Sequence, residues 1–280
     1  MQVIHQVAEV RALVAAWRSA GETVALVPTM GYLHAGHLSL VALARQHARR
    51  VVASIFVNPT QFGPSEDLDR YPRDDQGDRA KLGLAGTDAL FAPPPEAMYG
   101  PGFETWVRLE HLPEHLCGLS RPIHFRGVAT VCTKLFNIVQ PDVAVFGEKD
   151  YQQLLVIRRL VRDLDIPVQI IGGPIVREPD GLAMSSRNAN LSPDERRRAL
   201  ALSESLRLAE RMIHGGERSA SAVHGAMDAH IAASGGRADY VRLVDPDTLD
   251  DVDHIVGPVQ ATVAAFYGST RLIDNRRITP

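Results

Sequence analysis

The 280-residue chain has only two cysteines, Cys117 and Cys132, and they form no C-x-x-C motif. Zinc sites and dithiol redox centres usually rest on closely spaced cysteine pairs. The spacing therefore argues against both kinds of site. Cysteine is among the residue types most often buried, so we expect two reduced thiols in the core.

Long apolar runs and an excess of basic charge are also absent. No stretch of about eighteen apolar residues occurs, so we expect no transmembrane helix. Residues 1–5 lack the basic and apolar regions of a signal peptide. The formal net charge is -3 and the sequence pI about 6.4, whereas nucleic-acid binders usually carry a basic excess. We expect a cytoplasmic protein with no nucleic-acid or membrane partner.

Lysine is scarce. Of the 30 basic residues only Lys81, Lys134 and Lys149 are lysines. An ammonium group is a compact point charge that a guanidinium does not replace in a tight site. Lys149, in the motif Gly147-Glu148-Lys149-Asp150, is therefore a candidate for a phosphate contact, although it could also be an ordinary surface lysine.

What the chain does contain is an alternation of short apolar strands with helical segments. We expect strands at 24–27, 51–57, 88–91, 142–146 and 168–171, and helices at 37–49, 75–84, 127–138 and 151–164. Continuously apolar strands are typical of a parallel sheet covered on both faces. The alternation with helices predicts an α/β fold, a Rossmann-like doubly wound parallel sheet, over residues 1–175.

After about residue 175 the pattern changes. Ser192, Pro193 and Glu195 have the spacing of a capping box that opens a helix. We expect that helix to reach His214, followed by a second helix at 219–233 and strands at 240–244, 259–266 and 270–274. Residues 176–280 are therefore predicted to form a smaller C-terminal α+β domain.

Polar motifs follow three of the predicted strands, at residues 28–37, 58–62 and 147–150. In a parallel sheet the carboxyl ends of the strands meet at one edge, and ligands bind there. The three motifs therefore indicate one binding region.

The strongest of these motifs is His34-Ala35-Gly36-His37. A helix N-terminus has unpaired N–H groups and a positive potential that favour phosphate, and imidazoles three residues apart lie on the same side of the first turn. Gly36 allows a nucleotide to approach the backbone. Such a motif can hold a triphosphate and stabilise charge at the α-phosphorus. The same histidines could instead simply cap the helix.

Two further elements fit this interpretation. Met184-Ser185-Ser186-Arg187 resembles the Lys-Met-Ser-Lys-Ser loop that accompanies H-x-G-H in class I synthetases and nucleotidylyltransferases, with serine and arginine where that loop has lysines. Its hydroxyls and cation can hold a departing pyrophosphate, although a Ser-Ser-Arg turn is also a common solvated loop. Gln61 and Gln153 can each donate and accept hydrogen bonds, as a substrate with a hydroxyl and a carboxylate requires.

No metal site is predicted. The histidines outside these motifs show no convincing metal-ligand spacing; they include His111, His115, His214, His224 and His230.

Taken together, the motifs make the chain similar to the pantothenate synthetase family. The similar segments are residues 24–31, 34–37, 54–59, 61–62, 70–73, 120–122, 124–127, 134–137, 146–150, 185–188 and 271–275. The resemblance implies a cytoplasmic homodimer with a Rossmann-like N-terminal domain and a small C-terminal domain that closes over the site. It also implies the ATP-dependent condensation of pantoate with β-alanine to pantothenate, AMP and pyrophosphate, through a pantoyl-adenylate, with Mg²⁺ carried on the ATP phosphates.

The resemblance also implies roles for individual residues. His37, His34 and Lys149 would be catalytic, Gln61 and Gln153 would bind pantoate, and Gln61 would also contact β-alanine. The ATP contacts would be Met30, Gly31, Tyr32, Leu33, His34, Ala35, Gly36, His37, Gly147, Glu148, Lys149, Asp150, Val176, Met184, Ser185, Ser186 and Arg187. Two departures stand out: Ile123 in place of a glycine and Tyr151 in place of a phenylalanine.

Two alternatives remain. One is a nucleotidylyltransferase that acts on another small substrate, such as a phosphorylated alcohol; the Gln61 and Gln153 amides argue against it. The other is a catalytically silent adenine-nucleotide sensor, which the presence of both histidines and Lys149 disfavours.

Overall fold

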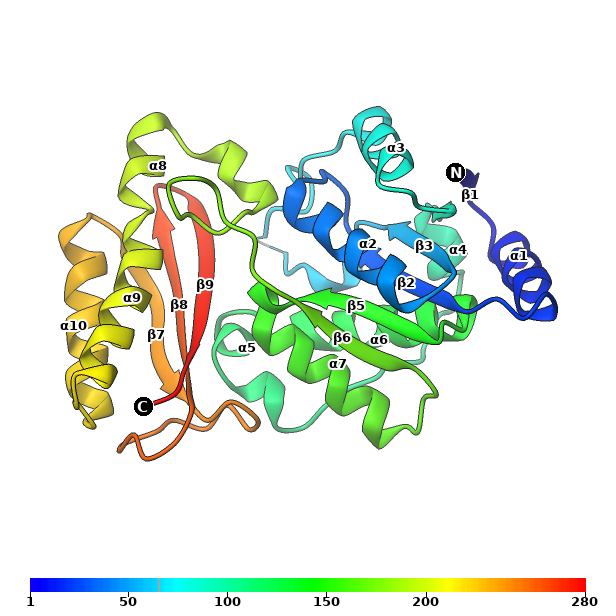
Figure 1. Ribbon diagram of the computed structural model, residues 1–280. Helices are drawn as coiled ribbons and strands as arrows, with labels where there is room; N and C mark the ends of the chain where they lie inside the picture. The colour runs from blue at the N-terminus through cyan, green and yellow to red at the C-terminus, as the bar shows by residue number, and fades with distance from the viewer. Residues whose placement is uncertain (65) are drawn as a thin grey trace. The chain divides into compact units, whose positions relative to one another are not determined.

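The computed structural model describes residues 1–64 and 66–280, which divide into two compact units (Figure 1). Unit 1 comprises Met1–Glu110, Arg121–Glu148 and Gln153–Pro174. Unit 2 comprises His111–Ser120, Lys149–Gln152 and Ile175–Pro280. Two short segments from the first 175 residues thus belong to the second unit. The division of roles between residues 1–175 and 176–280 stays a prediction.

Unit 1 is built on a six-stranded parallel sheet with the order β1-β4-β3-β2-β5-β6. The strands are β1 (Gln2–Ile4), β2 (Val24–Thr29), β3 (Arg50–Ile55), β4 (Ala89–Phe91), β5 (Val143–Gly147) and β6 (Gln169–Gly173). The five predicted strands are confirmed, with ends shifted by one or two residues. The sequence prediction missed the short edge strand β1, which pairs with β4.

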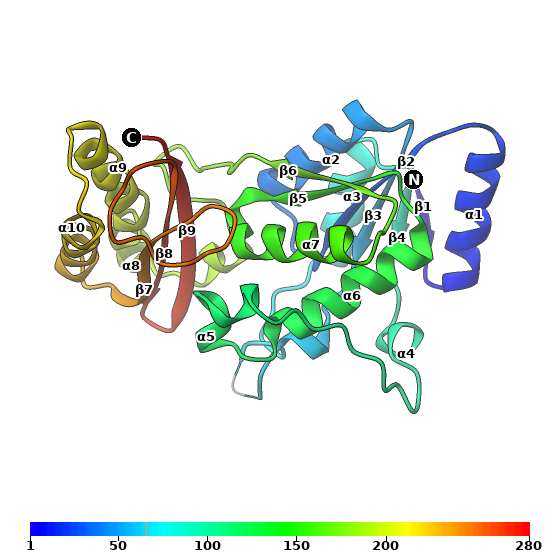
Figure 2. The same ribbon diagram turned by 90° about the horizontal axis from the view of Figure 1, so that it is seen from below.

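Helices cover both faces of this sheet (Figures 1 and 2). Ala25 and Val27 of β2 pack with the face that carries α2 (Ala35–His47) and α3 (Asp75–Leu84). Val24 and Leu26 point the other way, into the core that they share with α1 (Val7–Ser19), α6 (His124–Val139) and α7 (Tyr151–Asp163). Because adjacent strand residues are buried on opposite faces, the strands read as continuous apolar runs. The doubly wound fold is confirmed, while helix α1 was not predicted.

The connections that follow β3 and β4 are long. They contain the 3₁₀ turn η1 (Pro59–Gln61) after β3 and the helix α4 (Pro95–Met98) after β4. Another 3₁₀ turn, η3 (Glu148–Asp150), joins β5 to α7 and begins in unit 1.

Unit 2 has a three-stranded antiparallel sheet in the order β7-β8-β9, with strands Arg237–Val244, Val259–Tyr267 and Thr270–Ile278. Helices α9 (Ala201–His214) and α10 (Ala220–Ala233) pack on it around a shared apolar core. The three predicted strands are confirmed, although β9 continues four residues beyond the predicted end. Unit 2 also contains η2 (Leu112–Glu114) and α5 (Cys117–Ser120) in its first segment, and η4 (Ser186–Asn190) in its last.

The single helix predicted from Ser192 to His214 is wrong. The capping box of Ser192 and Glu195 is present, but it opens a short helix, α8 (Pro193–Arg198), and α9 begins separately. The break lies at Ala199, which is fully buried, and the amide of Leu202 bonds to the carbonyl of Ala199 three residues back. This tighter hydrogen-bond pattern redirects the chain so that the apolar face of α9 meets the sheet.

Both cysteine thiols are buried and reduced, as expected. Burial raises the pKa of the Cys132 thiol to about 12, which keeps it protonated. Over residues 1–64 and 66–280, no helix combines the length and the apolar character that crossing a bilayer requires.

Candidate active site

The two histidines of the H-x-G-H motif lie at the N-terminus of α2. His34 is the N-cap, and its Nδ1 accepts a hydrogen bond from the amide of Gly36 at 3.2 Å. The amide of His34 in turn donates to Nδ1 of His37 at 3.3 Å, and the ring centroids are 4.1 Å apart. The predicted same-side arrangement is confirmed, and so is the capping role considered as an alternative. The two roles are compatible because the cap is made by Nδ1 of each ring, whereas phosphate binding would use Nε2.

This geometry sets the tautomers of both rings. Each Nδ1 accepts from a main-chain amide and therefore carries no proton, so in a neutral imidazole the proton resides on Nε2. The Nε2–H groups of His34 and His37 are thus hydrogen-bond donors. Donors at a helix N-terminus have the polarity that a phosphate oxygen requires.

A buried carboxylate shapes the loop before α2. Asp78 of α3 is 1% exposed, and its two oxygens accept hydrogen bonds from the amides of Tyr32 and Leu33, both at 2.7 Å. Lys81 Nζ lies 3.7 Å from the same carboxylate. Gly31 has φ +86°, and a Cβ there would lie 3.1 Å from Asp78 Oδ2. Asp78 was not among the predicted site residues, because an acidic residue in the first turn of a helix usually only favours the helix dipole.

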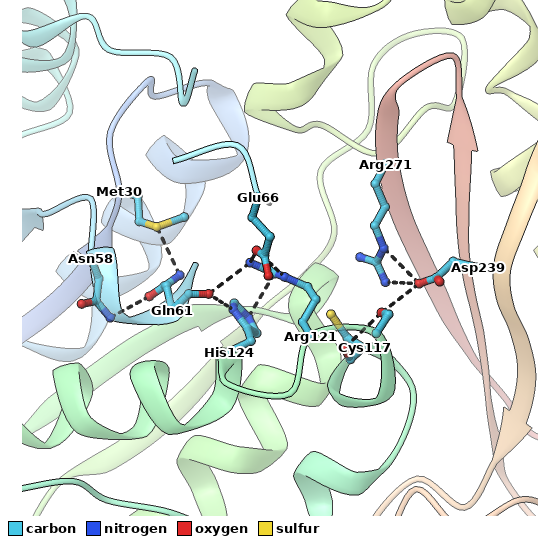
Figure 3. A network of polar contacts seen from close by, with 10 residues as sticks. Met30, Asn58, Gln61, Glu66, Cys117, Arg121, His124, Asp239 and Arg271 are labelled. Atoms are coloured by element: carbon cyan, nitrogen blue, oxygen red, sulfur yellow. Dashed lines mark hydrogen bonds and ion pairs between the residues drawn. The ribbon is translucent and has the colours of Figure 1, made fainter. Parts of the chain in front are cut away.

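Gln61 lies at the end of η1, in the loop that follows β3, and is 6% exposed. Its Nε2 donates to Met30 Sδ at 3.2 Å, and its Oε1 accepts from Asn58 Nδ2 at 3.1 Å. Figure 3 shows the Gln61 amide between Met30 and Asn58. The structure therefore brings together two predicted site residues, Gln61 and Met30, from the loops after neighbouring strands.

Behind Gln61, Asn58 is held by a tyrosine. The Tyr99 hydroxyl donates to Asn58 Oδ1 at 2.9 Å, and Asn58 is 1% exposed. Burial raises the pKa of Tyr99, so the hydroxyl stays protonated and remains a donor. Asn58 Nδ2 also donates to the carbonyl of Gly127 in α6 at 3.2 Å. The amide orientation of Gln61 thus depends on a chain of buried hydrogen bonds.

A second network fixes the backbone of Gln61. Its carbonyl oxygen accepts from Arg121 Nη2 at 3.3 Å and lies 3.1 Å from His124 Nδ1. Arg121 is paired with Glu66, Nε to Oε2, at 2.8 Å (Figure 3). Sequence reasoning gave these residues no role. The signal was present, since Arg121 and His124 belong to two of the segments that carry the family resemblance.

The remaining predicted residues of unit 1 lie where β5 leads into α7. Gly147 is the last residue of β5, and Glu148 begins η3. A Cβ on Gly172 of β6 would lie 3.0 Å from Glu148 Oε1. Gln153 is partly buried in the first turn of α7.

In unit 2, the backbone of Lys149 is anchored to β9. Asn275 Nδ2 donates to the Lys149 carbonyl at 2.9 Å, and Asn275 is 5% exposed. Lys149 Nζ lies 3.9 Å from Asp150 Oδ2, and its side chain is 21% exposed. Asn275 belongs to segment 271–275, the last of the segments that carry the family resemblance, and its side chain holds the backbone of Lys149 in place.

The Met184–Arg187 loop is also held within unit 2. The amide of Met184 donates to the carbonyl of Val176 at 3.0 Å, and an antiparallel bridge joins Arg177 to Ala183. Ser185 caps η4 by accepting from the amide of Arg187 at 3.3 Å. Two predicted ATP contacts, Val176 and Met184, are therefore direct neighbours across a hairpin.

Arg177 supports this hairpin. Its guanidinium forms a two-pronged ion pair with Asp274 of β9, with Nη1 to Oδ2 at 2.6 Å and Nη2 to Oδ1 at 3.0 Å. Asp274 is 3% exposed. A bidentate pair with a buried carboxylate fixes the orientation of both partners, so the start of the Met184–Arg187 loop has a rigid base.

Comparisons with known proteins agree with this arrangement of motifs. A family model described as pantoate-beta-alanine ligase matches residues 2–277. The pantothenate synthetase of Desulfatibacillum aliphaticivorans is 57% identical over 281 residues, which cover 100% of both chains. The crystal structure of pantothenate synthetase from Thermus thermophilus is similar with a TM-score of 0.95 and 48% identity, again over 100% of both chains.

A third match is a complex. The crystal structure of pantoate-beta-alanine ligase from Francisella tularensis, complexed with beta-gamma ATP and beta-alanine, has a TM-score of 0.84 and 32% identity. It covers 99% of this chain and 97% of that one. The family resemblance inferred from the motifs is confirmed, and this chain belongs to the pantoate-beta-alanine ligase family.

Proposed function

We propose that the chain catalyses the ATP-dependent condensation of pantoate with β-alanine, giving pantothenate, AMP and pyrophosphate. Membership of the family over the full chain supports this reaction. The structural observation that carries it is the pair of imidazoles at the N-terminus of α2, whose tautomers make both Nε2 groups donors.

The reaction needs activation of a carboxylate. Hydroxide or oxide is a poor leaving group, so a free carboxylate is a poor acyl donor. In the first step a pantoate carboxylate oxygen attacks the α-phosphorus of ATP, and the bond to pyrophosphate breaks. In the second step the free amine of β-alanine attacks the acyl carbon of the pantoyl-adenylate, AMP leaves, and the amine loses a proton.

We assign to His37 and His34 the stabilisation of the negative charge that develops on the phosphates. Their Nε2–H groups and the amides of the first turn of α2 can stabilise it without moving, because capping already fixes both rings. Lys149 and Arg187 add positive charge toward the pyrophosphate that leaves. The other ATP contacts proposed are residues 30–33, 35–36, 147–148, 150, 176 and 184–186.

Gln61 and Gln153 are assigned to the binding of pantoate, and Gln61 is also assigned a contact with β-alanine. The buried contacts to Met30 and Asn58 hold the Gln61 amide in one orientation. A preorganised amide can position the carboxylate for attack, and positioning alone can supply much of the rate.

Mg²⁺ belongs to this proposal as an ion carried by the ATP phosphates. Mg²⁺ usually keeps several waters and is bound through one or two carboxylates plus substrate phosphates. Asp150, whose side chain is 49% exposed next to Lys149, is a carboxylate of that type, so the residues present fit the ion. When bound, Mg²⁺ would neutralise phosphate charge. We also propose, from the family resemblance, that the chain works as a cytoplasmic homodimer.

Exchange of labelled pyrophosphate into ATP tests the proposal. Exchange should require pantoate and Mg²⁺ and should proceed without β-alanine, because the adenylate forms before the amine reacts. Exchange that is indifferent to pantoate would point to a nucleotidylyltransferase with another substrate. ATP binding with no exchange under any condition would point to a nucleotide sensor.

A further inference from the structure

Unit 2 contains a cluster of two histidines and an aspartate outside the motifs described above. His111 and His115 flank η2 as its N-cap and C-cap residues, and Asp250 lies in the loop between β7 and β8. His111 Nε2 is 3.2 Å from Asp250 Oδ1, His115 Nε2 is 3.8 Å from the same oxygen, and the two Nε2 atoms are 3.3 Å apart.

These three atoms have the spacing of metal ligands. A triangle with edges of 3.2, 3.3 and 3.8 Å has a point about 2.0 Å from all three corners, which is the bond length of zinc to imidazole nitrogen or carboxylate oxygen. The ring centroids of His111 and His115 are 4.6 Å apart, farther than their Nε2 atoms. Both rings therefore turn their Nε2 ends toward the same point.

We propose that His111, His115 and Asp250 bind a divalent transition-metal ion of the Zn²⁺ class, with water completing its coordination. Two imidazoles and one carboxylate suit Zn²⁺, whereas Mg²⁺ and Ca²⁺ prefer oxygen ligands. The side chains of His111 and Asp250 are 54% and 57% exposed, so an ion can enter from solvent.

Contacts within the protein hold the loop that carries the two histidines. Gln152, which is 6% exposed, donates to the carbonyls of Leu112 and His115 at 2.8 and 2.7 Å, and accepts from the amide of Cys117 at 3.0 Å. A Cβ on Gly118 would lie 1.6 Å from the carbonyl oxygen of Pro113, so only glycine fits this turn. The backbone that carries the two imidazoles is thus held by the fold.

The loop that carries Asp250 is equally well defined. Asp245 Oδ1 accepts from the amides of Asp247 and Thr248, and the amide of Asp245 donates to the carbonyl of Asp250 at 2.8 Å. The hydroxyl of Tyr151 donates to the carbonyl of Pro246 at 2.7 Å.

A bound ion would therefore cross-link two loops that already contact adjacent residues, Gln152 and Tyr151. These residues directly follow Lys149 and Asp150. The ion would act as a structural brace for the start of α7, distinct from any ion carried by ATP.

The test is titration of the metal-free full chain with Zn²⁺ alone, followed by calorimetry, and with Co²⁺, followed by its visible spectrum. We expect one ion per chain and a Co²⁺ spectrum of low-symmetry, four-coordinate type. His111→Ala, His115→Ala and Asp250→Asn should each weaken the affinity by about tenfold or more. His254→Ala, which removes an exposed histidine from the same β7–β8 loop as Asp250, should leave the affinity unchanged.

Three outcomes would overturn the site: no binding, binding that the three ligand variants leave unchanged, or an equal loss in His254→Ala. Circular dichroism of each variant checks the fold, and His111 is exposed enough that its removal opens no core cavity. X-ray absorption at the zinc edge gives an independent readout, since it counts imidazole ligands directly. Because neither measurement uses catalysis, failure here leaves the proposed reaction untouched, and pyrophosphate exchange without Zn²⁺ binding would refute the site alone.

Discussion

His37 Nδ1 accepts a hydrogen bond from the main-chain amide of His34, at 3.3 Å, so the second histidine of the motif closes the cap that the first one begins. Nδ1 of each ring stabilises the helix, and Nε2 carries the proton that the proposed chemistry uses. The two roles can be separated by substitution.

Asparagine and glutamine at position 37 should differ in activity. Asparagine places an acceptor where Nδ1 lies but no donor near Nε2, so His37→Asn should lose adenylation by about a hundredfold. Glutamine places a donor near Nε2, and at the third position of the helix its side chain can also accept from the amide of His34, so His37→Gln should retain more activity with little change in stability. Pyrophosphate exchange and urea unfolding measure the two quantities.

His47→Ala is the matched control, because His47 is an exposed histidine in the last turn of the same helix. It should change neither quantity much. If His37→Asn and His37→Gln prove equally active, the assignment of the donor to Nε2 is wrong.

Gln61→Ala should act mainly on pantoate. The substitution removes an amide that Met30 and Asn58 hold in place, and it leaves the H-x-G-H loop and its Asp78 contacts unchanged. We expect KM for pantoate to rise about tenfold or more, as loss of uniform substrate binding does, with KM for ATP within about twofold. Gln46→Ala, at an exposed position of α2, is the control. A rise in KM for ATP alone would contradict the assignment.

Gly127→Ala should destabilise the protein although alanine favours helices. A Cβ at residue 127 would lie 2.5 Å from the carbonyl oxygen of Thr60 and 2.6 Å from the amide of Gln61. Helix propensity alone would gain about 1 kcal/mol, but the clash is with backbone, so the loop that carries Gln61 must move. We expect a lower urea midpoint and a higher KM for pantoate.

Gly225→Ala is the control for this substitution. Gly225 lies inside α10, and a Cβ there meets nothing within 4 Å. It should raise the free energy of unfolding by about 0.5–1 kcal/mol. If Gly127→Ala behaves in the same way, the close approach of α6 to the Gln61 loop is not a constraint.

Asp78→Asn should disturb the nucleotide loop. The carboxylate accepts from the amides of Tyr32 and Leu33, and an asparagine side chain has only one oxygen to offer them. One buried amide then loses its partner, which costs about 1–3 kcal/mol. We expect lower stability and a higher KM for ATP, with KM for pantoate less affected. Asp75→Asn, an exposed acidic residue of the same helix, should leave both parameters unchanged.

The elements of the fold were largely predictable because their signals are local. An apolar strand buried on both faces is visible in consecutive residues, as at Val24–Val27, and a capping box is visible within four residues, as at Ser192 and Glu195. The break at Ala199 was not predictable, since Leu200 and Leu202 continue a helical pattern. That break is decided by how α9 meets the sheet.

In the candidate site, too, the features with a local signal were predictable and those that depend on tertiary packing were not. The sequence by itself determined the H-x-G-H motif, because two histidines three residues apart and a strand before them are local facts. It also determined the family, through the order of its motifs along the chain. Only the tertiary structure decided which contacts hold those motifs in their conformation, because the contacts join residues that are distant in the sequence. Asp78 accepts from the amide of Leu33, 45 residues away, and Gln61 donates to Met30, 31 residues away.

The His111, His115 and Asp250 cluster shows this most clearly. The spacing of the histidines predicted no metal site, because their third partner lies far along the chain in another loop. Buried hydrogen bonds and converging ligands depend on which loops the packed core brings together, and residues distant in sequence carry no local trace of that contact.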